Sequence, residues 1–458
     1  MSGTSLLNPL CRHIRGITVK TLSPETLEHA KLVLLDTAGV VTAGASNPEV
    51  DATARGMARG ETPLAGSFFS PGRPESFSLL DAAFVAGMSS STLEFEEGNP
   101  RAMGHPAVQV VPALFTAAQE LDCSGGELIS ALVGGYEAAC RVSRAARMRK
   151  GLHPSGTWGV VGSALAVGLL RGRSARDLED LANLAASYAF SPYVYNSFDG
   201  WNAAATFAGL VNHLGILANT LFDSGVRAHP DAFEKTFSAF LSEGLDPGVL
   251  DPGQDEPPAI VQNYFKPYPT CRFTQPAMEA LREIMENHPV EPSLVERISV
   301  HSFASAVHGG SGPPSNREAL RFSIPYLLAV MIVNGTMDLE VLDRDFLGNP
   351  LVTELARKVE TTLDPEYEAR RPAKSQARVE VILKDGRALS AEILDCLGDV
   401  ANPLGRDDVF DKFMSLAGKA VGREQARAFL DGLPSLEKQA AVEPWLRCLV
   451  PGEKAHER

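Results

Sequence analysis

Two histidines that each precede a proline are the residues of this chain best suited to moving protons. His105 ends an acidic loop, and His153 stands in the glycine-rich segment 151–159. An imidazole titrates near neutral pH, so it can serve as a general base or a general acid. Both histidine–proline pairs precede apolar segments of small residues, which is typical of a helix start with proline at its first position. We therefore expect His105 and His153 to share one site.

The acidic loop before His105 carries three carboxylates, on Glu94, Glu96 and Glu97, together with Arg101. It follows a predicted helix near residues 79–88, in which apolar residues recur at steps of three and four. Loops held between rigid helices are frequent places for catalytic groups. The alternative is a solvated acidic turn without a chemical function. The loop by itself leaves both interpretations open.

A second set of charged residues lies in the motif from Lys266 to Arg272, K-P-Y-P-T-C-R. A compact ammonium and a bidentate guanidinium are complementary anchors for a dicarboxylate. The alternative is that both residues form salt bridges between domains. A further basic cluster precedes His153, although a solvated helix end is the commoner meaning of such a run; it comprises Arg144, Arg147, Arg149 and Lys150.

Composition limits the kinds of partner. With 458 residues and 44% hydrophobic content, the chain can bury a large core divided over two or three domains. The formal net charge of -14 argues against nucleic acid or an anionic membrane as a partner. An anionic substrate would require a local basic focus.

The cysteines and the N-terminus bear on location and on cofactors. Six cysteines are scattered without a C-x-x-C pair, which favours reduced thiols over disulfides, zinc or an iron–sulfur cluster. The N-terminus lacks a secretory pattern, and the apolar segment Gly159 to Leu170 is shorter than the ~20 residues of a membrane span. We expect a cytoplasmic protein with no metal and no membrane contact.

The elements expected around these residues are mainly helices. Capping patterns predict helices after Ser23, Ser124 and Ser174, whereas the stretch 44–74 is predicted to be loop with short elements. A proline- and glycine-rich linker begins near Asp246. Beyond it, a strand at 298–303 and a hairpin at 377–394, turning at Asp385-Gly386, predict a smaller α+β domain. From about residue 403 the helical pattern returns and is expected to pack back onto the first domain.

Several motifs in sequence order resemble the MmgE/PrpD family, which includes 2-methylcitrate dehydratases, cis-aconitate decarboxylases and an iminodisuccinate epimerase. They are E-F-E-E with H-P-A and V-P-A-L, then L-H-P-S-G-T-W-G, then K-P-Y-P-T-C-R-F-T-Q-P-A-M-E-A-L. The resemblance covers nearly the whole chain. It implies a helical domain of residues 1–266, completed by 403–458, with a smaller α+β lid domain of residues 267–402 inserted over the site. It also implies a homodimer and a reaction without a cofactor.

The resemblance also assigns the site residues. His105 and His153 match the two family histidines that line the pocket, and Tyr326, in R-F-S-I-P-Y, matches a pocket phenol, although a buried structural tyrosine is nearly as plausible. With Glu94, these are the expected catalytic groups. The expected residues for binding a carboxylate substrate are Lys266, Arg272, Arg101 and Gln275.

Three departures from the family pattern bear on the substrate. Ala204 stands where family members usually carry a lysine, the usual aspartates of D-F-D-D are replaced by the longer Glu94, Glu96 and Glu97, and Gln275 replaces a histidine. These changes suggest a ligand that is less anionic than the familiar tricarboxylates, or differently shaped.

Our hypothesis from the sequence is a dehydratase acting on a small hydroxy- or polycarboxylate. A histidine or Glu94 would remove the proton next to the carboxylate, Lys266 and Arg272 would hold that carboxylate, and His153 or Tyr326 would protonate the departing hydroxyl. Decarboxylation and epimerisation would use the same anchors, so the sequence does not separate the three reactions. A non-catalytic homologue that only binds a small acid is the remaining alternative.

Overall fold

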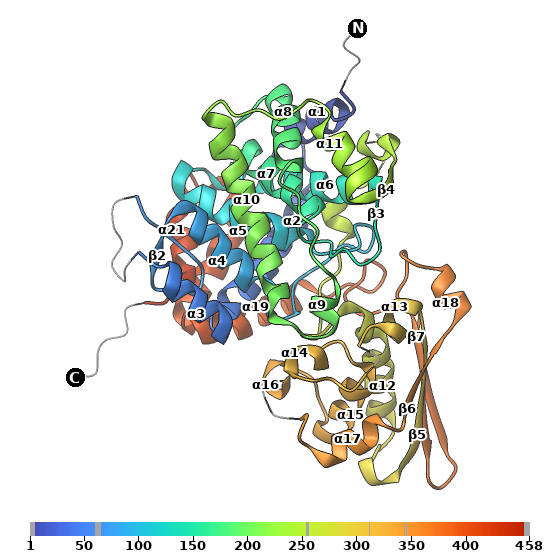
Figure 1. The fold of residues 1–458 in the computed structure, drawn as a ribbon. Helices are drawn as coiled ribbons and strands as arrows, with labels where there is room; N and C mark the ends of the chain where they lie inside the picture. Colours follow the sequence, from blue (N-terminus) through green and yellow to red (C-terminus); the bar gives the residue numbers. More distant parts are fainter. Residues whose placement is uncertain are drawn as a thin grey trace, which may run out of the picture.

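Two separate hydrophobic cores organise the chain. The computed structural model describes residues 5–59, 66–252, 256–310, 312–342, 344 and 346–452. One large helical body contains most of the buried apolar side chains, and a smaller α+β unit with its own core lies at one end of it (Figure 1). The prediction of a mainly α protein is therefore confirmed.

The helical body begins with α1 and α2 and includes most of the described chain up to residue 252. Its α-helices are α1 (Asn8–Gly16), α2 (Pro24–Gly44), α3 (Pro48–Met57), α4 (Leu79–Ser89), α5 (Pro106–Leu121), α6 (Gly125–Ala145), α7 (Trp158–Leu170), α8 (Ala175–Ala186), α9 (Tyr195–Phe198), α10 (Ala205–Asp223) and α11 (Ala232–Lys235). Short 3-10 turns η1 (Asn202–Ala204), η3 (Pro247–Leu250) and η4 (Ala259–Gln262) and one π-turn, η2 (Thr236–Phe240), connect or extend them. Two short hairpins pair β1 (Phe68–Phe69) with β2 (Ser76–Phe77), and β3 (Ala146–Met148) with β4 (Ser242–Leu245).

Local capping explains where the long helices begin. The Ser23 side chain accepts from the amide of Thr26 at the start of α2, and Ser124 forms a reciprocal capping box with Glu127 at the start of α6. Ser174 does the same for α8. Each arrangement satisfies amides that have no partner within the helix. The three predicted helix starts are confirmed.

The prediction for residues 44–74 needs a correction, because α3 forms within that stretch. Asn47 caps α3 and Pro48 occupies its first turn. Only Val50 and Ala54 of this helix are buried, so it lacks a long apolar period that could reveal it. Part of the predicted loop, residues 60–65, and part of the predicted linker, residues 253–255, lie outside the described residues.

Small side chains allow the central helices to approach closely. A Cβ atom on Gly162 of α7 would lie 2.7 Å from the Cβ atom of Ala139 on α6, and one on Gly215 of α10 would lie 2.1 Å from the Oγ atom of Ser163. The stretch Asn202–Asp223, which includes α10, is long and apolar enough to cross a membrane, but 56% of its most apolar window is buried among the neighbouring helices. Its composition is that of a core helix.

The smaller unit is a four-stranded sheet with helices packed on it. The strand order is β6 (Val359–Leu363), β5 (Val295–Ser302), β7 (Ala377–Leu383) and β8 (Ala388–Ile393), parallel between β5 and β6 and antiparallel elsewhere. The predicted strand at 298–303 and the predicted hairpin at Asp385-Gly386 are confirmed. The helices of this unit are α12 (Gln275–Asn287), α13 (Ala304–His308), α14 (Arg317–Leu320), α15 (Ile324–Asn334), α16 (Leu339–Leu342), α17 (Pro350–Ala356) and α18 (Pro365–Ala369), with the 3-10 turns η5 (Arg272–Thr274) and η6 (Pro292–Leu294).

The C-terminal helices return to the helical body, as predicted. They are α19 (Arg406–Ala420), α20 (Arg423–Gly432) and α21 (Glu443–Leu446), with η7 (Leu433–Lys438) and η8 (Arg447–Leu449). Phe413, Phe429 and Trp445 stack in succession inside the same core as α2. The boundaries at residues 267 and 402, and motion of the smaller unit as a lid, stay predictions.

Candidate active site

The acidic loop between α4 and α5 is folded tightly against the segment that leads into the smaller unit. Gly98 pairs with Tyr264, and Asn99 pairs with Gly104, through short backbone bridges. Glu94 and Met103 have left-handed backbone, with φ of 51° and 52°. Such conformations are costly for residues other than glycine and are often found at functional sites. Backbone pairing therefore holds the loop in one conformation up to His105, where α5 begins.

His105 is the N-cap residue of α5, and its neutral form is defined by a hydrogen bond. Its Nδ1 atom lies 2.7 Å from the backbone carbonyl oxygen of Glu97, so Nδ1 carries the hydrogen and donates it. Its Nε2 atom consequently holds the lone pair, and it lies 3.6 Å from Oε1 of Glu96, too far for a hydrogen bond. Burial, followed by the positive charge of Lys266, lowers the pKa of His105 to about 4. His105 is therefore neutral at pH 7 and able to accept a proton.

His153 has the opposite tautomer. The backbone amide of Ser155 donates to Nδ1 of His153 over 3.1 Å, so in the neutral ring the hydrogen is on Nε2. Burial, followed by the nearby His105, lowers the pKa of His153 to about 4. The expected helix start at this residue was wrong, because α7 begins only at Trp158 and His153 lies in the preceding turn.

Both histidines line one cavity of about 430 Å³ between the helical body and the smaller unit. Among its described lining residues, the aromatic rings are Trp158, Phe198, Tyr264, Phe273 and Phe322. The charged lining residues are five cations, Arg101, Arg149, Lys150, Arg272 and Arg371, and two acids, Glu94 and Asp399. The cavity is therefore lined by an excess of positively charged side chains, in a protein whose net charge is -14. An anionic ligand of modest size fits this environment.

Arg272 approaches this cavity from the smaller unit with part of its guanidinium unsatisfied. Its Nη1 atom donates to Gln275 and to the carbonyl of Leu397, and Nη2 lies 2.5 Å from a carboxylate oxygen of Asp399. The group also stacks on the Tyr264 ring at 4.6 Å. Its Nε atom is buried without a hydrogen-bond partner among the described residues. A carboxylate entering the cavity could satisfy that donor.

Sequence models of one family match both parts of the chain. The sequence model of the MmgE/PrpD N-terminal domain matches residues 8–248, and that of the MmgE/PrpD C-terminal domain matches residues 268–437. The chain belongs to the MmgE/PrpD family. A cis-aconitate decarboxylase from Aspergillus terreus is 23% identical over 478 residues, covering 97% of this chain and 96% of that protein. A cis-aconitate decarboxylase from Mus musculus is 23% identical over 461 residues, covering 93% and 89%.

Lys266, in the family motif K-P-Y-P-T-C-R, is a structural cation rather than a residue of the cavity. Its side chain is fully buried, and its Nζ atom contacts the carbonyl of Glu94 at 2.9 Å, the Glu94 carboxylate at 3.2 Å and the Glu96 carboxylate at 3.4 Å. These contacts use all three ammonium hydrogens. The sequence led us to expect that Lys266 binds a substrate carboxylate. In the structure its ammonium group is instead occupied by Glu94 and Glu96.

The two carboxylates around Lys266 differ in protonation. Burial raises the pKa of Glu96 to about 7, against the opposing effect of Lys266. For Glu94, burial also opposes ionisation, but the charge of Lys266, together with its hydrogen bond to Glu94, outweighs burial and lowers the pKa of Glu94. Glu94 is thus the ionised carboxylate of the cavity. It is suited to stabilising a positive charge on a histidine rather than to removing a proton from carbon.

Glu97 lies behind the site and fixes the start of α5. Its Oε1 atom accepts from the amide of Ala107 at 2.9 Å, and Oε2 accepts from Tyr136 at 2.8 Å and from Asn263 at 3.3 Å. Burial raises the pKa of Glu97 to about 8. The alternative of a solvated acidic turn therefore does not apply to Glu96 and Glu97, which are 2% and 0% exposed.

The other residues expected at the site fall into different places. Arg101 lines the cavity but is half exposed and pairs with Glu256 at 3.4 Å. Gln275 is fully buried and holds the K-P-Y-P-T-C-R turn through the carbonyls of Tyr268 and Thr270. Tyr326 lies on α15 against the core of the smaller unit and does not line the cavity.

The family departure at Ala204 leaves no cation in its place. Ala204 lies in η1 and lines a small hollow, and among the described residues that line this hollow the cation is Arg321. That guanidinium donates to the carbonyls of Leu93 and Pro269 and pairs with Glu318.

Of the basic cluster before His153, only Arg149 and Lys150 line the cavity, whereas Arg144 pairs with Glu256. The cavity residue that sequence reasoning missed is Arg371.

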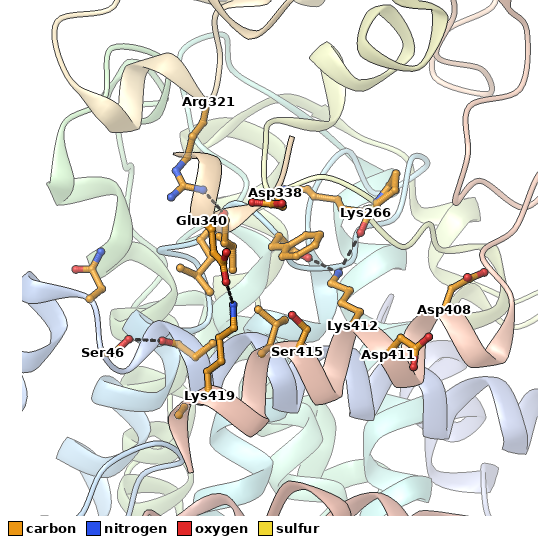
Figure 2. A pocket seen from close by; sticks show the side chains of 18 of the residues that line it. Ser46, Lys266, Arg321, Asp338, Glu340, Asp408, Asp411, Lys412, Ser415 and Lys419 are labelled. Atoms are coloured by element: carbon orange, nitrogen blue, oxygen red, sulfur yellow. Dashed lines mark hydrogen bonds and ion pairs between the residues drawn. The ribbon is translucent and has the colours of Figure 1, made fainter. Parts of the chain in front are cut away.

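A larger cleft of about 910 Å³ lies elsewhere between the two units and shares no lining residue with the histidine cavity. Figure 2 shows its cations directed at partners within the protein. Lys412 on α19 pairs with Asp36 at 2.7 Å and donates to the carbonyl of Lys266 at 3.2 Å, and Lys419 pairs with Glu340 across the cleft. Because these charges are already paired, we place the site at the smaller cavity.

Proposed function

We propose that this protein is a cofactor-independent lyase that dehydrates a small hydroxy acid carrying two or three carboxylates. One observation carries the proposal: His105 and His153 face a single cationic cavity, one with a free lone pair on Nε2 and the other with a hydrogen on Nε2. An elimination next to a carboxylate needs a base and a hydrogen-bond donor for the leaving oxygen at the same time.

The chemical step follows from these two tautomers. His105 removes the proton from the carbon next to a carboxylate that Arg272 holds, and the electron pair of that C–H bond forms the new double bond. The C–O bond breaks while the Nε2–H group of His153 polarises the departing oxygen. The hydroxide then takes the proton that His105 had accepted and leaves as water, so both histidines are neutral again. Glu94 stabilises the transient positive charge on His105.

Decarboxylation is a second candidate, because the relatives that match nearly the whole chain are named cis-aconitate decarboxylases. In that reaction the bond between carbon and a carboxylate breaks, and carbon dioxide leaves while its bonding electron pair stays on the carbon. The resulting carbanion takes the Nε2 hydrogen of neutral His153 as a proton, and a proton from water then restores His153. The cationic cavity would hold the remaining carboxylates in the same way. At 23% identity the reaction of the relatives is a proposal for this chain.

The experiment is to incubate the purified protein in deuterated water with citrate, 2-methylcitrate and cis-aconitate and to follow the acids by NMR. Dehydration gives a new vinylic signal from citrate and, from 2-methylcitrate, either a vinylic signal or a methyl signal shifted by an adjacent double bond. Decarboxylation gives dissolved carbon dioxide from cis-aconitate. Deuterium entering next to a carboxylate without either product indicates epimerisation. Binding of an acid with no exchange, no new signal and no gas, identical to a His105→Gln control, contradicts a catalytic function.

We also propose that the protein is a homodimer. Three large aromatic side chains in or near α9 are exposed: Tyr193, Tyr195 and Trp201, at 59%, 46% and 65%. Exposed aromatic groups of this size commonly mark contact surfaces. Light scattering should give about twice the chain mass of 49.0 kDa, and Trp201→Ser should weaken association. A mass of one chain at every concentration contradicts the dimer. The cytoplasmic location stays a prediction.

A further inference from the structure

We infer that Arg371 is a carboxylate anchor of this cavity and that it forms, with Arg272, a pair of guanidinium groups that select substrates with at least two carboxylates. The inference rests on the proposed function in one respect, that the ligand is a small polycarboxylate. It adds the residue that determines this specificity. No motif in the sequence distinguishes Arg371 from its neighbour Arg370.

Arg371 is held in place by aromatic rings rather than by an acid. It follows α18, and its guanidinium carbon lies 4.5 Å from the ring centre of Phe303 and 5.3 Å from that of Phe273. Its Nη1 atom donates to the hydroxyl of Ser375 at 2.5 Å. Stacking fixes the plane of a guanidinium while leaving its edge available for hydrogen bonds. The group is therefore preorganised to receive a planar carboxylate.

The guanidinium of Arg371 forms no ion pair with any of the described residues. No carboxylate of a described residue lies within 4.0 Å of its guanidinium, whereas Arg272, Arg101 and Arg149 each have an acid or backbone carbonyls as partners. Burial lowers the pKa of Arg371; Tyr264 and the more distant acids Glu368 and Asp399 oppose this effect, and the charge of Arg272 adds to it. Two like charges brought together in a cavity, one of them unpaired, are disfavoured unless an anion binds there.

Arg272 supplies the second half of the anchor. Its side chain is 5% exposed, its Nε atom is buried without a hydrogen-bond partner among the described residues, and it lines the same cavity as Arg371. A ligand with two carboxylates can contact both arginines at once. It would then supply a partner for the Nε atom of Arg272 and a counterion for Arg371. A ligand with a single carboxylate can engage only one. The pair thus discriminates by the number of carboxylates on the substrate.

Binding can be measured without turnover by titrating the full-length protein calorimetrically with tricarballylate, succinate and butyrate. Arg371→Gln should raise the Kd for tricarballylate and succinate by ~10–100-fold, the usual effect of losing a charge-assisted bidentate contact, and change the weak binding of butyrate by less than about threefold. Arg371→Lys keeps the charge but loses the planar guanidinium that binds a carboxylate through two hydrogen bonds and stacks on the aromatic rings. Its Kd values should therefore lie between those of wild type and Arg371→Gln. Arg370→Gln is the matched control, since Arg370 is 47% exposed and does not line the cavity.

The outcomes separate this inference from the proposed reaction. If tricarballylate binding depends on Arg371 but no acid is turned over, the proposed reaction fails and the anchor stands. If acids are turned over and Arg371→Gln binds tricarballylate within twofold of wild type, the anchor is refuted. Failure of wild type to bind tricarballylate and succinate also refutes it. Should Arg371→Gln not fold, as judged by its melting temperature, equal binding by wild type and a folded Arg371→Lys protein refutes the bidentate contact.

Discussion

His105 and His153 line the same cavity as complementary tautomers, because the Nδ1 atom of one donates to a carbonyl and the Nδ1 atom of the other accepts from an amide. Neither assignment depends on a choice of protonation, since a carbonyl oxygen can only accept and a backbone amide can only donate. The backbone around each ring thus fixes which histidine offers a lone pair and which offers a hydrogen. Two residues of the same type thereby acquire different chemical functions.

The hydrogen-bonding function of His153 predicts a graded mutational series. His153→Ala removes the donor to the leaving oxygen and should lower kcat by ~10²–10³-fold. His153→Gln keeps an N–H donor of similar reach and should recover at least tenfold of that loss. His213→Gln on α10, outside the cavity, is the control and should retain wild-type kcat. Equal kcat for the alanine and glutamine variants would show that His153 must give up a proton.

The function of His105 as a base predicts activity at unusually low pH. The base must be neutral, and burial together with Lys266 lowers the pKa of His105 to about 4, so its neutral fraction is lost only as the pH falls through about 4. The rate of exchange next to the carboxylate should therefore be similar at pH 7 and pH 5. An ordinary histidine would lose about 25-fold in neutral fraction over that interval. A loss of that size would rule out His105 as the base in the form described.

Removal of Lys266 should destabilise the fold rather than simply weaken binding. Lys266→Met leaves Glu94 and Glu96 buried without their cation, and breaking a buried ion pair on one side costs ~3–5 kcal/mol. Adding Glu94→Gln and Glu96→Gln to that variant should restore part of the loss. The unfolding midpoint in urea measures both effects. A lysine that served mainly as a substrate anchor would instead give an unchanged midpoint and a raised KM.

The raised pKa of Glu97 predicts that the effect of Glu97→Gln on stability depends on pH. Burial raises the pKa of Glu97 to about 8, whereas the unfolded side chain loses its proton near 4.5, so folding takes up a proton between these values. Wild-type stability from this group therefore falls as the pH rises from about 4.5 to 8, by at most ~1.4 kcal/mol per pH unit. An amide nitrogen in place of Oε2 cannot accept from Tyr136 and Asn263, which is a cost of Glu97→Gln that does not vary with pH. The melting temperature of Glu97→Gln relative to that of wild type should therefore rise between pH 5.5 and pH 8. Exposed Glu283→Gln on α12 is the control and should show no such trend.

Local signals explain what the sequence predicted well. Ser124 and Glu127 act on their own backbone, and Asp385-Gly386 turns a hairpin from two adjacent residues, so both were readable without tertiary structure. The two histidines were found because each precedes a proline and an apolar segment, and the family resemblance then assigned them to a pocket. Even there the tautomers were not predictable, since they depend on which backbone groups meet each ring.

The charged residues show why the rest was not predictable. Lys266 and Arg272 lie six residues apart in one motif, yet Lys266 is enclosed by Glu94 and Glu96 while Arg272 reaches the cavity. Arg370 and Arg371 are neighbours of the same type, and only the second stacks on Phe273 and Phe303. Packing between segments far apart in the chain decides these differences. That packing cannot be predicted from the type of a residue alone.

The left-handed backbone of Glu94 places a residue with a conformational cost where its charge is needed. Glycine and asparagine adopt this conformation at lower cost than glutamate, by roughly 1 kcal/mol, but either one removes a carboxylate that pairs with buried Lys266 at 3.2 Å, which costs more. A library of all substitutions ranked by thermal stability should therefore place glutamate above both. A ranking by growth on a substrate of the enzyme should also place glutamate first, because the charge beside His105 is retained, so position 94 is a site where laboratory evolution for robustness would preserve function.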